Sequence, residues 1–367
     1  MHCLLLPERR FGGKYLIVRQ RMLSISIVED DILHRPCDLL ILKHADGFLG
    51  VDDLVAERLR FRDTVEAGKY ALLEGKRIEA KQVLFLGVGP LGEFRYAQIR
   101  RFGRQALKLA SELVESPEVL CMPIHGPGYG LDESEAFLSL IGGLMDAIAV
   151  EDLPATLKRI EIVEISAQRV LRMRHLLAKA LEQRPAEVVK RGSVDIATRR
   201  KERSAAAQQR GPLIDHRKAK EELADYGAAS EKKIRIFVAM PFKDEYIDEY
   251  DIAIIEAAQH ANIVCERIDK EAYVGDIMNQ VKDRIASYHG MLALLNDANP
   301  NVYLEIGYAW AKEKPTVLIA KKGQKLPFDI RGQKCIVYTN IKDLRDRLKT
   351  ELKTLIDNGT LVAASRS

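Results

Sequence analysis

The sequence lacks the grouped cysteines and histidines of disulfide-rich and zinc-binding proteins. Its five cysteines are widely scattered, with no Cys-x-x-Cys pair and no His-rich cluster. Because both kinds of site need ligands or thiols close together, the sequence argues against a disulfide framework and a structural zinc site. Four cysteines border apolar runs, which predicts buried, reduced thiols: Cys37, Cys121, Cys265 and Cys335. We expect no bound metal and no cofactor.

Long apolar runs and a strong charge of one sign are missing too. No stretch approaches the roughly 20 apolar residues of a membrane-spanning helix, and the apolar part of residues 1–7 is too brief for a signal peptide. A net charge of +4 over 367 residues does not call for a nucleic-acid or membrane partner. We therefore expect a cytoplasmic protein with no membrane partner.

The apolar pattern predicts two folded units of the α/β class, since the chain is long enough for two cores. Over residues 23–183, short apolar runs alternate with helical periodicity, which is typical of a mostly parallel sheet. Predicted strands are Ser24–Val28, Cys37–Leu42, Gln82–Gly87, Val119–Met122 and Arg159–Ile165, and predicted helices are Asp52–Ala67, Tyr96–Glu115, Glu133–Ala149 and Ala167–Glu182. Residues 1–22 are expected to be an extension with little fold content.

Residues 184–232 differ from both units and are interpreted as a basic linker. From 184 to 220, eleven Lys and Arg stand against four acidic residues, a balance of +7, with almost no aromatic or long apolar side chains. This composition is typical of a linker or a solvated helix. Clustered cations also attract phosphates, but no aromatic residues are interleaved for base stacking, so nucleic acid is a less favoured partner.

Residues 233–358 form the second unit, and 359–367 form a tail. Five short apolar runs alternate with helical patterns, which predicts a five-stranded parallel sheet of the flavodoxin-like kind. Predicted strands are Ile234–Ala239, Ile263–Arg267, Met291–Leu295, Thr316–Ala320 and Cys335–Tyr338, and predicted helices are Asp244–His260, Val274–Ser287, Pro300–Lys312 and Ile341–Asp357.

A turn after the third of these strands carries the first of two candidate catalytic carboxylates. Asp297 lies at the carboxyl end of a strand, which is the side on which open α/β sheets bind ligands. Asn299 is a good N-cap and Pro300 suits the first helical position, so a helix should start here. Asp297 could also serve only to start this turn.

The second candidate carboxylate, Glu305, falls in the second turn of the predicted helix, on one face with Asn301 and Tyr308. Cleavage of an N-glycosidic bond passes through an oxocarbenium-like state, which a nearby carboxylate stabilises or captures covalently. Glu305 is the candidate for that role, and an ordinary solvated helix residue is the alternative. Asp297 would hold a ribose hydroxyl, or assist the leaving base as an acid if its environment raised its pKa.

Other residues near these carboxyl ends suit a nucleoside. An aromatic base could lie against Phe242 or Tyr303, although both are equally compatible with a core position, and ribose hydroxyls could bind to aspartates. The candidate substrate-binding residues are Met240, Pro241, Phe242, Asp269, Asn299, Asn301, Tyr303 and Tyr308.

These segments resemble a known superfamily. Residues 236–242 (IFVAMPF), 297–309 (DANPNVYLEIGYA) and 314–319 (KPTVLI) look like the nucleoside 2-deoxyribosyltransferase-like and TIR-like proteins. The resemblance covers about 30 per cent of the chain, residues 234–340, and implies a flavodoxin-like fold that cleaves or transfers at nucleoside, nucleotide or NAD glycosidic bonds. It matches Glu305 to the family's catalytic glutamate and Asp297 to the acid ending the third strand. The spacer 299–302 departs from the small residues usual in deoxyribosyltransferases, which favours hydrolysis over base exchange.

Two glycine-rich loops follow strands of the first unit. Their candidate nucleotide-binding residues are Gly87, Gly89, Gly126, Gly128, Tyr129 and Gly130. Glycines free the backbone to turn N–H groups toward an anion, and the helix after residue 132 adds a partial positive charge. Tight turns without a ligand are the alternative, and His125 is expected to pack or bond within its turn.

The order of these pieces over residues 23–150 is similar to macro domains and to the amino-terminal domain of leucine aminopeptidases. That resemblance implies an ADP-ribose-like or cyclic nucleotide ligand and no peptidase activity. The combined hypothesis is a nucleotide-regulated hydrolase of NAD or a related nucleotide, of the kind found in prokaryotic antiviral defence. A non-enzymatic nucleotide-binding signalling module and a metabolic deoxyribosyltransferase stay open as alternatives. The expected partner is a small nucleotide, and a homo-oligomer is compatible with the chain.

Overall fold

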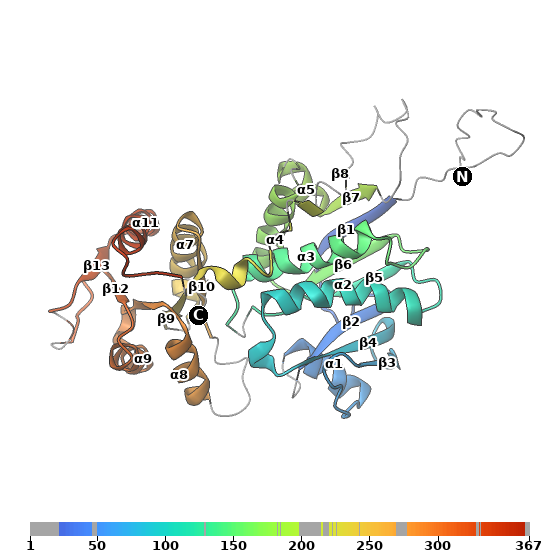
Figure 1. Cartoon of the computed structure of the whole chain (residues 1–367), viewed down its shortest axis with the longest axis horizontal. Coiled ribbons are helices and arrows are strands. Elements are labelled where there is room, and N and C mark those ends of the chain that lie inside the picture. Colours follow the sequence, from blue (N-terminus) through green and yellow to red (C-terminus); the bar gives the residue numbers. More distant parts are fainter. Residues whose placement is uncertain are drawn as a thin grey trace, which may run out of the picture.

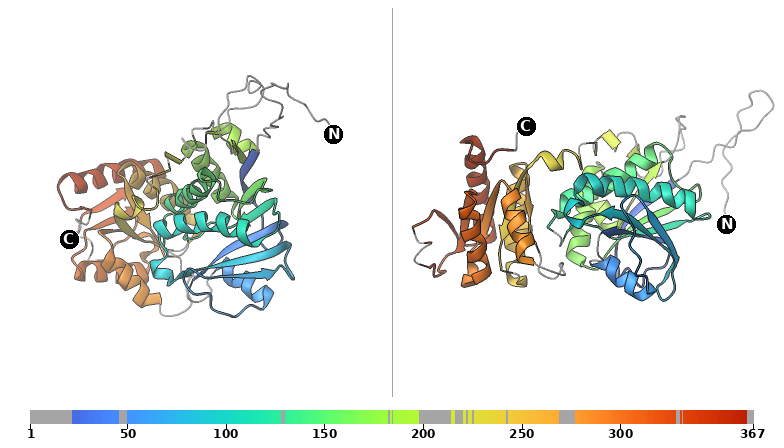
Figure 2. Two further views of the ribbon diagram at one scale, coloured as in Figure 1. Left: turned by 45° about the vertical axis from the view of Figure 1, so that its right-hand side comes forward. Right: turned by 60° about the horizontal axis from the view of Figure 1, so that its bottom comes forward.

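The computed structural model contains two β-sheets, each with helices on both faces, which lie side by side along the long axis of the molecule (Figures 1 and 2). The structure describes residues 22–45, 50–127, 130–181, 183, 185–197, 214–215, 220–221, 223–224, 226–241, 243–268, 277–327, 330 and 332–363. The expected extension lies outside these residues, apart from Met22. Within the described ranges, no helix is long and apolar enough to cross a membrane.

The first sheet has eight strands in the order β3-β4-β2-β5-β6-β1-β7-β8. Its central strands β4, β2, β5, β6 and β1 are parallel, whereas β3 and β7 pair antiparallel with β4 and β1. The strands are β1 Met22–Glu29, β2 Cys37–Ala45, β3 Tyr70–Glu74, β4 Ala80–Gly89, β5 Val119–Met122, β6 Arg159–Glu164, β7 Ser193–Ala197 and β8 Ile214–Asp215. The mixed α/β class with parallel strands is confirmed.

Strand β2 shows why this sheet is covered on both faces. Leu39 and Ile41 pack in a cluster with residues of α2 and α3, whereas Leu40 and Leu42 pack with Val55 of α1 on the opposite side. A run of apolar residues without alternation is what a doubly covered parallel strand needs. The helices are α1 Val51–Leu59, α2 Tyr96–Leu113, α3 Glu133–Ala149, α4 Ala167–Ala180 and α5 Pro185–Arg191, with a 3-10 turn at Leu91–Glu93.

The helix predicted for Asp52–Ala67 is wrong in its second half. The helix α1 ends at Leu59, and Arg60 takes a left-handed conformation with φ of 58°. Phe61 is nevertheless buried, because it stacks on Phe85 with ring centroids 5.2 Å apart. Its apolar character therefore reflects loop packing and not a helical face.

The basic linker predicted for 184–232 is wrong over 185–197. This segment forms α5 and then β7, which pairs with β1 from Met22↔Ala197 to Ser26↔Ser193. Val194 and Ile196 are buried in the main cluster of the first sheet. Two alternating apolar residues decide the structure here, although charged residues dominate the surrounding composition. Residues 198–213 lie outside the part of the chain that the structure describes.

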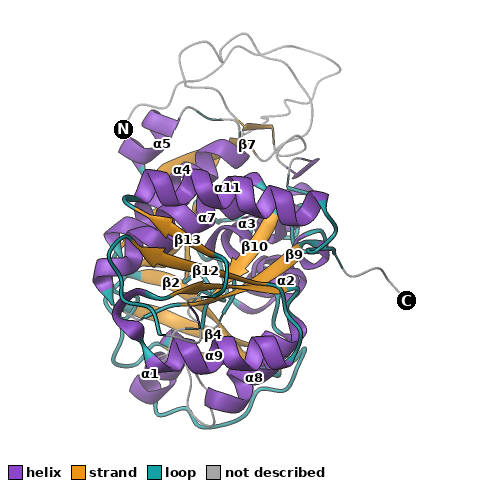
Figure 3. Ribbon diagram, turned by 90° about the vertical axis from the view of Figure 1, so that its left-hand side faces the viewer, coloured by secondary structure: helices purple, strands orange, loops and turns teal. Residues whose placement is uncertain are grey.

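The second sheet has five parallel strands in the order β10-β9-β11-β12-β13. Helices α7 and α11 cover one face, and α8 and α9 cover the other (Figure 3). The strands are β9 Ile234–Ala239, β10 Ile263–Glu266, β11 Gly290–Leu294, β12 Thr316–Lys321 and β13 Cys335–Tyr338. The helices are α7 Ile255–His260, α8 Ile277–Ser287, α9 Pro300–Ala311 and α11 Ile341–Asp357. Short turns of helix lie at Ser230–Lys232, Asp244–Tyr246, Glu249–Ile254 (a π-helix) and Asn296–Ala298.

Helices α2 and α3 cross so closely that glycine is required at the contact. A Cβ built on Gly143 would lie 2.0 Å from the carbonyl oxygen of Arg100, and one built on Gly103 would lie 2.8 Å from the carbonyl oxygen of Leu140. Real Cβ atoms do not approach backbone this closely, so the two helices would have to separate. This crossing holds α3 close against α2, and the first residues of α3 extend toward the second sheet.

We expect Gly143→Ala to lower the free energy of unfolding by about 1–3 kcal/mol, because the methyl group overpacks the helix crossing. Urea denaturation measures this change. Gly307→Ala is the matched control in a helix, since a Cβ at Gly307 meets no atom within 4 Å. That variant should be neutral or stabilising by up to about 1 kcal/mol. Equal effects of the two substitutions would contradict the assigned crossing.

Candidate functional site

The carboxyl ends of β9, β10 and β11 meet at one edge of the second sheet, because the three strands are parallel neighbours. Met240 and Pro241 follow β9, Arg267 follows β10, and Asn296 and Asp297 follow β11. Chain segments beyond this edge are where an open α/β sheet binds ligands. The structure thus brings the predicted residues 240, 241 and 297 to one edge.

Asn296 anchors the turn that presents Asp297. Its side-chain amide donates to the Tyr338 hydroxyl at 2.8 Å, and its side-chain oxygen accepts from the N–H of Lys321 at 3.0 Å. The Tyr338 hydroxyl donates in turn to buried Glu249 at 2.8 Å. Asp297 then adopts a left-handed φ of 62°, which is unfavourable for a residue with a Cβ. Such strain persists only where the surroundings fix the backbone, as this buried network does.

Lys243 and Tyr246 are the hydrogen-bond partners that shift the pKa of Asp297. The Lys243 ammonium lies 2.5 Å from the Asp297 carboxylate, and the Tyr246 hydroxyl also hydrogen-bonds to it. Hydrogen bonds from Lys243 and then Tyr246 hold the pKa of Asp297 below its usual range. The alternative in which Asp297 donates a proton to the leaving base needs a shift of the pKa in the opposite direction, and it stays the less favoured prediction. The role as acceptor for a sugar hydroxyl stays a prediction.

Glu305 lies on α9, which begins as the sequence predicts. Asn299 caps the helix by accepting the N–H of Asn301 at 2.9 Å, and Pro300 is the first helical residue. A buried stripe of Val302, Ile306 and Ala309 faces the sheet. Glu305 is half-buried beside this stripe, on the same flank as Asn301 and Tyr308, because residues three and four apart are neighbours on a helix.

Tyr303 occupies the opposite flank of α9 from Glu305. It packs against the cluster between the sheet and the pair α8 and α9. Its hydroxyl is buried and has no hydrogen-bond partner among the described residues, and burial raises the pKa of this phenol. Buried hydroxyls without a partner are costly, so this oxygen is the unsatisfied polar atom of the flank.

The remaining predicted substrate residues lie as follows. Met240 and Pro241 are buried, and the Met240 sulfur accepts from the Arg267 guanidinium at 3.5 Å. Arg267 also stacks over the Tyr250 ring, 4.5 Å from its centroid. Met240 is therefore a buried residue at this edge of the sheet. Phe242 and Asp269 lie outside the described residues.

Gly87 and Gly89 of the first sheet are explained by backbone contacts and conformation, without a ligand. A Cβ on Gly87 would lie 1.9 Å from the carbonyl oxygen of Glu66, and the Gly87 N–H donates to the carbonyl of Lys69 at 2.9 Å. Gly89 has a positive φ of 78°. The loop after β4 is therefore shaped by its neighbouring chain, and the Gly87 N–H already has a partner.

The loop after β5 lies against the second sheet. Gly126 and Gly130 have positive φ values of 113° and 95°, and a Cβ on Gly130 would lie 2.9 Å from Nη1 of Arg284 in α8. Gly128 and Tyr129 are outside the described residues. His125 is buried and accepts the N–H of Lys43 at 3.2 Å, and burial lowers its pKa well below the usual range. The expectation that His125 packs is confirmed, although its hydrogen-bond partner belongs to β2 and not to its own turn.

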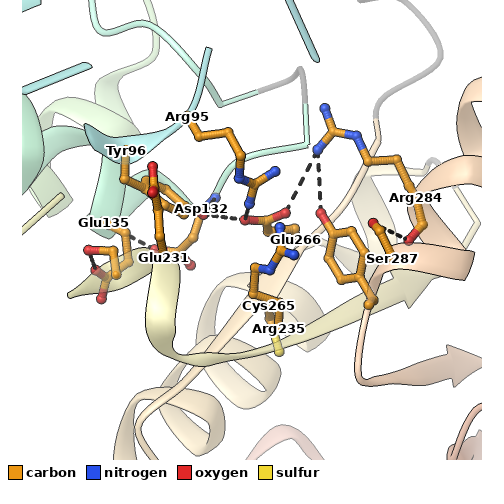
Figure 4. A network of polar contacts seen from close by, with 12 residues as sticks. Arg95, Tyr96, Asp132, Glu135, Glu231, Arg235, Cys265, Glu266, Arg284 and Ser287 are labelled. Carbon is orange, nitrogen blue, oxygen red and sulfur yellow. Dashed lines mark hydrogen bonds and ion pairs between the residues drawn. The ribbon is translucent and has the colours of Figure 1, made fainter. Parts of the chain in front are cut away.

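Sequence reasoning missed the residues that connect the two sheets. The Glu266 carboxylate, fully buried at the end of β10, accepts from Arg95 at 2.8 Å and from the Tyr96 hydroxyl at 2.5 Å (Figure 4). Sequence reasoning also missed Lys243 and Tyr246. For Glu266, the only available signal was an acidic residue within an otherwise apolar strand, which is rare unless the charge is paired. No group of three or more His, Cys, Asp or Glu that could hold a metal ion occurs in the described ranges.

The chain matches no protein-family model and no curated protein. Among solved structures it is similar to a Trypanosoma brucei macrodomain in complex with ADP, at 18% identity and a TM-score of 0.34 over 40% of this chain and 65% of that chain, just under two thirds. An Oceanobacillus iheyensis macrodomain with ADP matches at 15% identity and a TM-score of 0.34, over 44% of this chain and 98% of that one. A Clostridium botulinum CMP N-glycosidase matches at 21% identity and a TM-score of 0.27, over 32% and 98%.

We expect Lys243→Met to raise the pKa of Asp297 toward an ordinary carboxyl value, because the ammonium that favours the charged form is lost. The depressed pKa means that the pair stabilises the fold above the unfolded pKa of the carboxyl, and that this contribution is lost as the pH falls through the folded pKa. Titration followed by carboxyl-carbon NMR measures the shift. Lys325→Met removes the same charge at an exposed position and should leave Asp297 unchanged. An unaltered pKa in Lys243→Met would refute the pairing.

Proposed function

We propose that this chain is a nucleotide-regulated N-glycosidase that hydrolyses the glycosidic bond of NAD or a related nucleotide. The carboxyl edge of the second sheet is the hydrolytic site, with Glu305 and Asp297 as its two carboxylates. The loop after β5 in the first sheet is the regulatory nucleotide site. We further propose that the two sheets belong to two domains, the first macro-like and the second TIR-like or deoxyribosyltransferase-like. The strand order of the second sheet supports the flavodoxin-like assignment.

The observation that carries this proposal is the position of Asp297 together with its ion pair with Lys243. A carboxylate kept ionised by Lys243 sits on a strained turn at the carboxyl edge of a parallel sheet, immediately before the helix that bears Glu305. Unusual backbone conformations gather at functional sites, and this supports the assignment of the turn to the site. An ionised carboxylate accepts hydrogen bonds from the two hydroxyls of a ribose.

The proposed reaction needs one carboxylate near the anomeric carbon. As the bond to the base breaks, its electron pair leaves with the base, and Glu305 stabilises or captures the cationic sugar. Water then supplies a hydroxyl to the anomeric carbon and a proton to the solution. Asp297 holds the sugar hydroxyls during both steps, which fixes the position of the anomeric carbon.

The charge of Asp297 also favours one class of leaving group. A neutral base such as cytosine departs as an anion unless an acid protonates it, whereas the cationic nicotinamide of NAD departs as a neutral molecule. Hydrogen bonds from Lys243 and Tyr246 lower the pKa of Asp297, which makes this carboxyl less suited to protonate such a base. A nicotinamide nucleotide is therefore the best-matched substrate. Unregulated loss of NAD would harm the cell, which fits a controlled effector of prokaryotic antiviral defence.

We expect Glu305→Gln to lower nicotinamide release from NAD at least about 100-fold while leaving substrate binding in place, because the amide cannot stabilise a cationic sugar. Chromatography of NAD incubated with the pure protein, with and without added ADP-ribose, measures release. Glu313→Gln makes the same change just beyond α9 and should keep the wild-type rate.

Other outcomes separate the rival functions. Tight binding of NAD without any release would identify a nucleotide-binding signalling module. Transfer of deoxyribose from a deoxynucleoside to added free adenine would identify a deoxyribosyltransferase. Release of cytosine from CMP faster than nicotinamide from NAD would contradict the leaving-group argument.

A further inference from the structure

Four consecutive residues at the start of α3 connect it to the second sheet or the segment leading into it, two of them directly and two through one intermediate side chain. Glu133 binds Arg172, which also binds Asp251 at 2.9 Å, and Ser134 accepts from Gln259 at 3.2 Å. Glu135 accepts from Lys233 at 2.5 Å and from the hydroxyl of Ser230. Asp132, the N-cap of α3, reaches the second sheet through Tyr96. The start of α3 directly follows the loop after β5, so this loop leads straight into the interface.

The hydroxyl of Tyr96 joins that loop to strand β10. It accepts the N–H of Asp132 at 2.9 Å and donates to Oε1 of Glu266 at 2.5 Å (Figure 4). On the loop side, the N–H of Leu131 donates to the carbonyl of Gly126 at 3.3 Å. Tyr96 is fully buried, so water does not replace either hydrogen bond. A movement of residue 132 therefore acts on Glu266 through a single oxygen atom.

Glu266 continues the path into the second sheet. It is the last residue of β10, and its Oε1 also accepts from Arg95 at 2.8 Å. Its Oε2 lies 3.8 Å from Nη1 of Arg284, which belongs to α8. Nη1 of Arg284 is also the nearest atom to a Cβ built on Gly130. One carboxylate thus connects the first sheet, the end of β10 and the helix beside α9.

Strand β10 contacts the first sheet through one apolar side chain as well as through Glu266. Val264 packs into the core cluster of the first sheet, and Glu266, two residues on, faces the same way along the strand. A buried carboxylate that loses its donors bears a large desolvation cost. The strand end must therefore follow Tyr96 and Arg95 when they move.

We propose that the Asp132–Tyr96–Glu266 hydrogen bonds are a relay through which nucleotide binding at the loop after β5 regulates the hydrolytic edge of the second sheet. This inference rests on the proposed function for its ligand, but the relay itself is a property of the protein without ligand. Tyr96 acts through Glu266 and is a positioning residue. A shift of β10 would reach the hydrolytic edge because β10 is hydrogen-bonded to β9, and β9 leads into the buried residues Met240 and Pro241 at that edge.

The first experiment uses the full chain without ligand. Tyr96→Phe removes only the relaying oxygen and should speed amide exchange about tenfold both at 124–132 and at 263–268, because each side loses its shared partner. Glu266→Gln keeps the shape of the side chain and should reproduce the effect. Tyr70→Phe, in the exposed part of β3, is the matched control and should change neither segment. Faster exchange on one side only, or on neither, overturns the relay.

The second experiment adds ADP-ribose as the probe. In the wild-type protein, protection at 124–127 and 130–132 should be accompanied by changed exchange at 263–268 and 281–288, and Tyr96→Phe should retain the first effect and lose the second. Protection of the loop with no remote change, or with a remote change that survives Tyr96→Phe, overturns the inference and leaves the proposed function standing. Absence of both ADP-ribose binding and NAD hydrolysis overturns the proposed function, and the ligand-free experiment still decides the relay.

Discussion

The carboxylate of Glu266 is the constraint on which the arrangement of this molecule depends. A buried negative charge is tolerated only with donors around it, and here Arg95 and Tyr96 supply them from the first sheet. Buried ion pairs add little net stability compared with apolar packing, but they accept very few geometries. These hydrogen bonds join the end of β10 to the start of α2 and, through Tyr96, to the N-cap of α3. The glycines at the α2–α3 crossing allow those two helices to pack closely behind it.

That constraint brings together the two regions to which we assign ligands, which come from distant parts of the sequence. Carboxyl ends of strands in both sheets meet near it: the loop after β5 on one side, and the end of β10 on the other. The hydrolytic edge itself depends on a second buried network, from Glu249 through Tyr338 to Asn296, which holds the strained turn at Asp297. Neither network contains a residue of an obvious motif. Both consist of polar groups whose partners lie far away in the chain.

Much of the fold could be predicted because strand and helix periods are local. Strands β5, β9 and β13 and helices α3 and α11 have the predicted bounds, and α9 starts at the predicted residue, because caps, apolar runs and helical spacing agree there. The failures have specific causes. Phe61 and Val65 suit a helical period but are buried by loop packing. Strand β7 was hidden by neighbouring charges, although Val194 and Ile196 alternate as a half-buried strand should.

The sequence by itself determined the α/β class, the strands and helices listed above, and the placement of Asp297 and Glu305 around a strand-to-helix turn, because each depends on residues close together in the chain. Only the tertiary structure decided the hydrogen-bond partners of Asp297, since Lys243 and Tyr246 lie some fifty residues away in sequence. It also decided that Gly87 serves close backbone approach, and that Tyr96 and Glu266 join the two sheets. Hydrogen bonds and close contacts between distant residues have no local pattern, so the chain must fold before they can be seen.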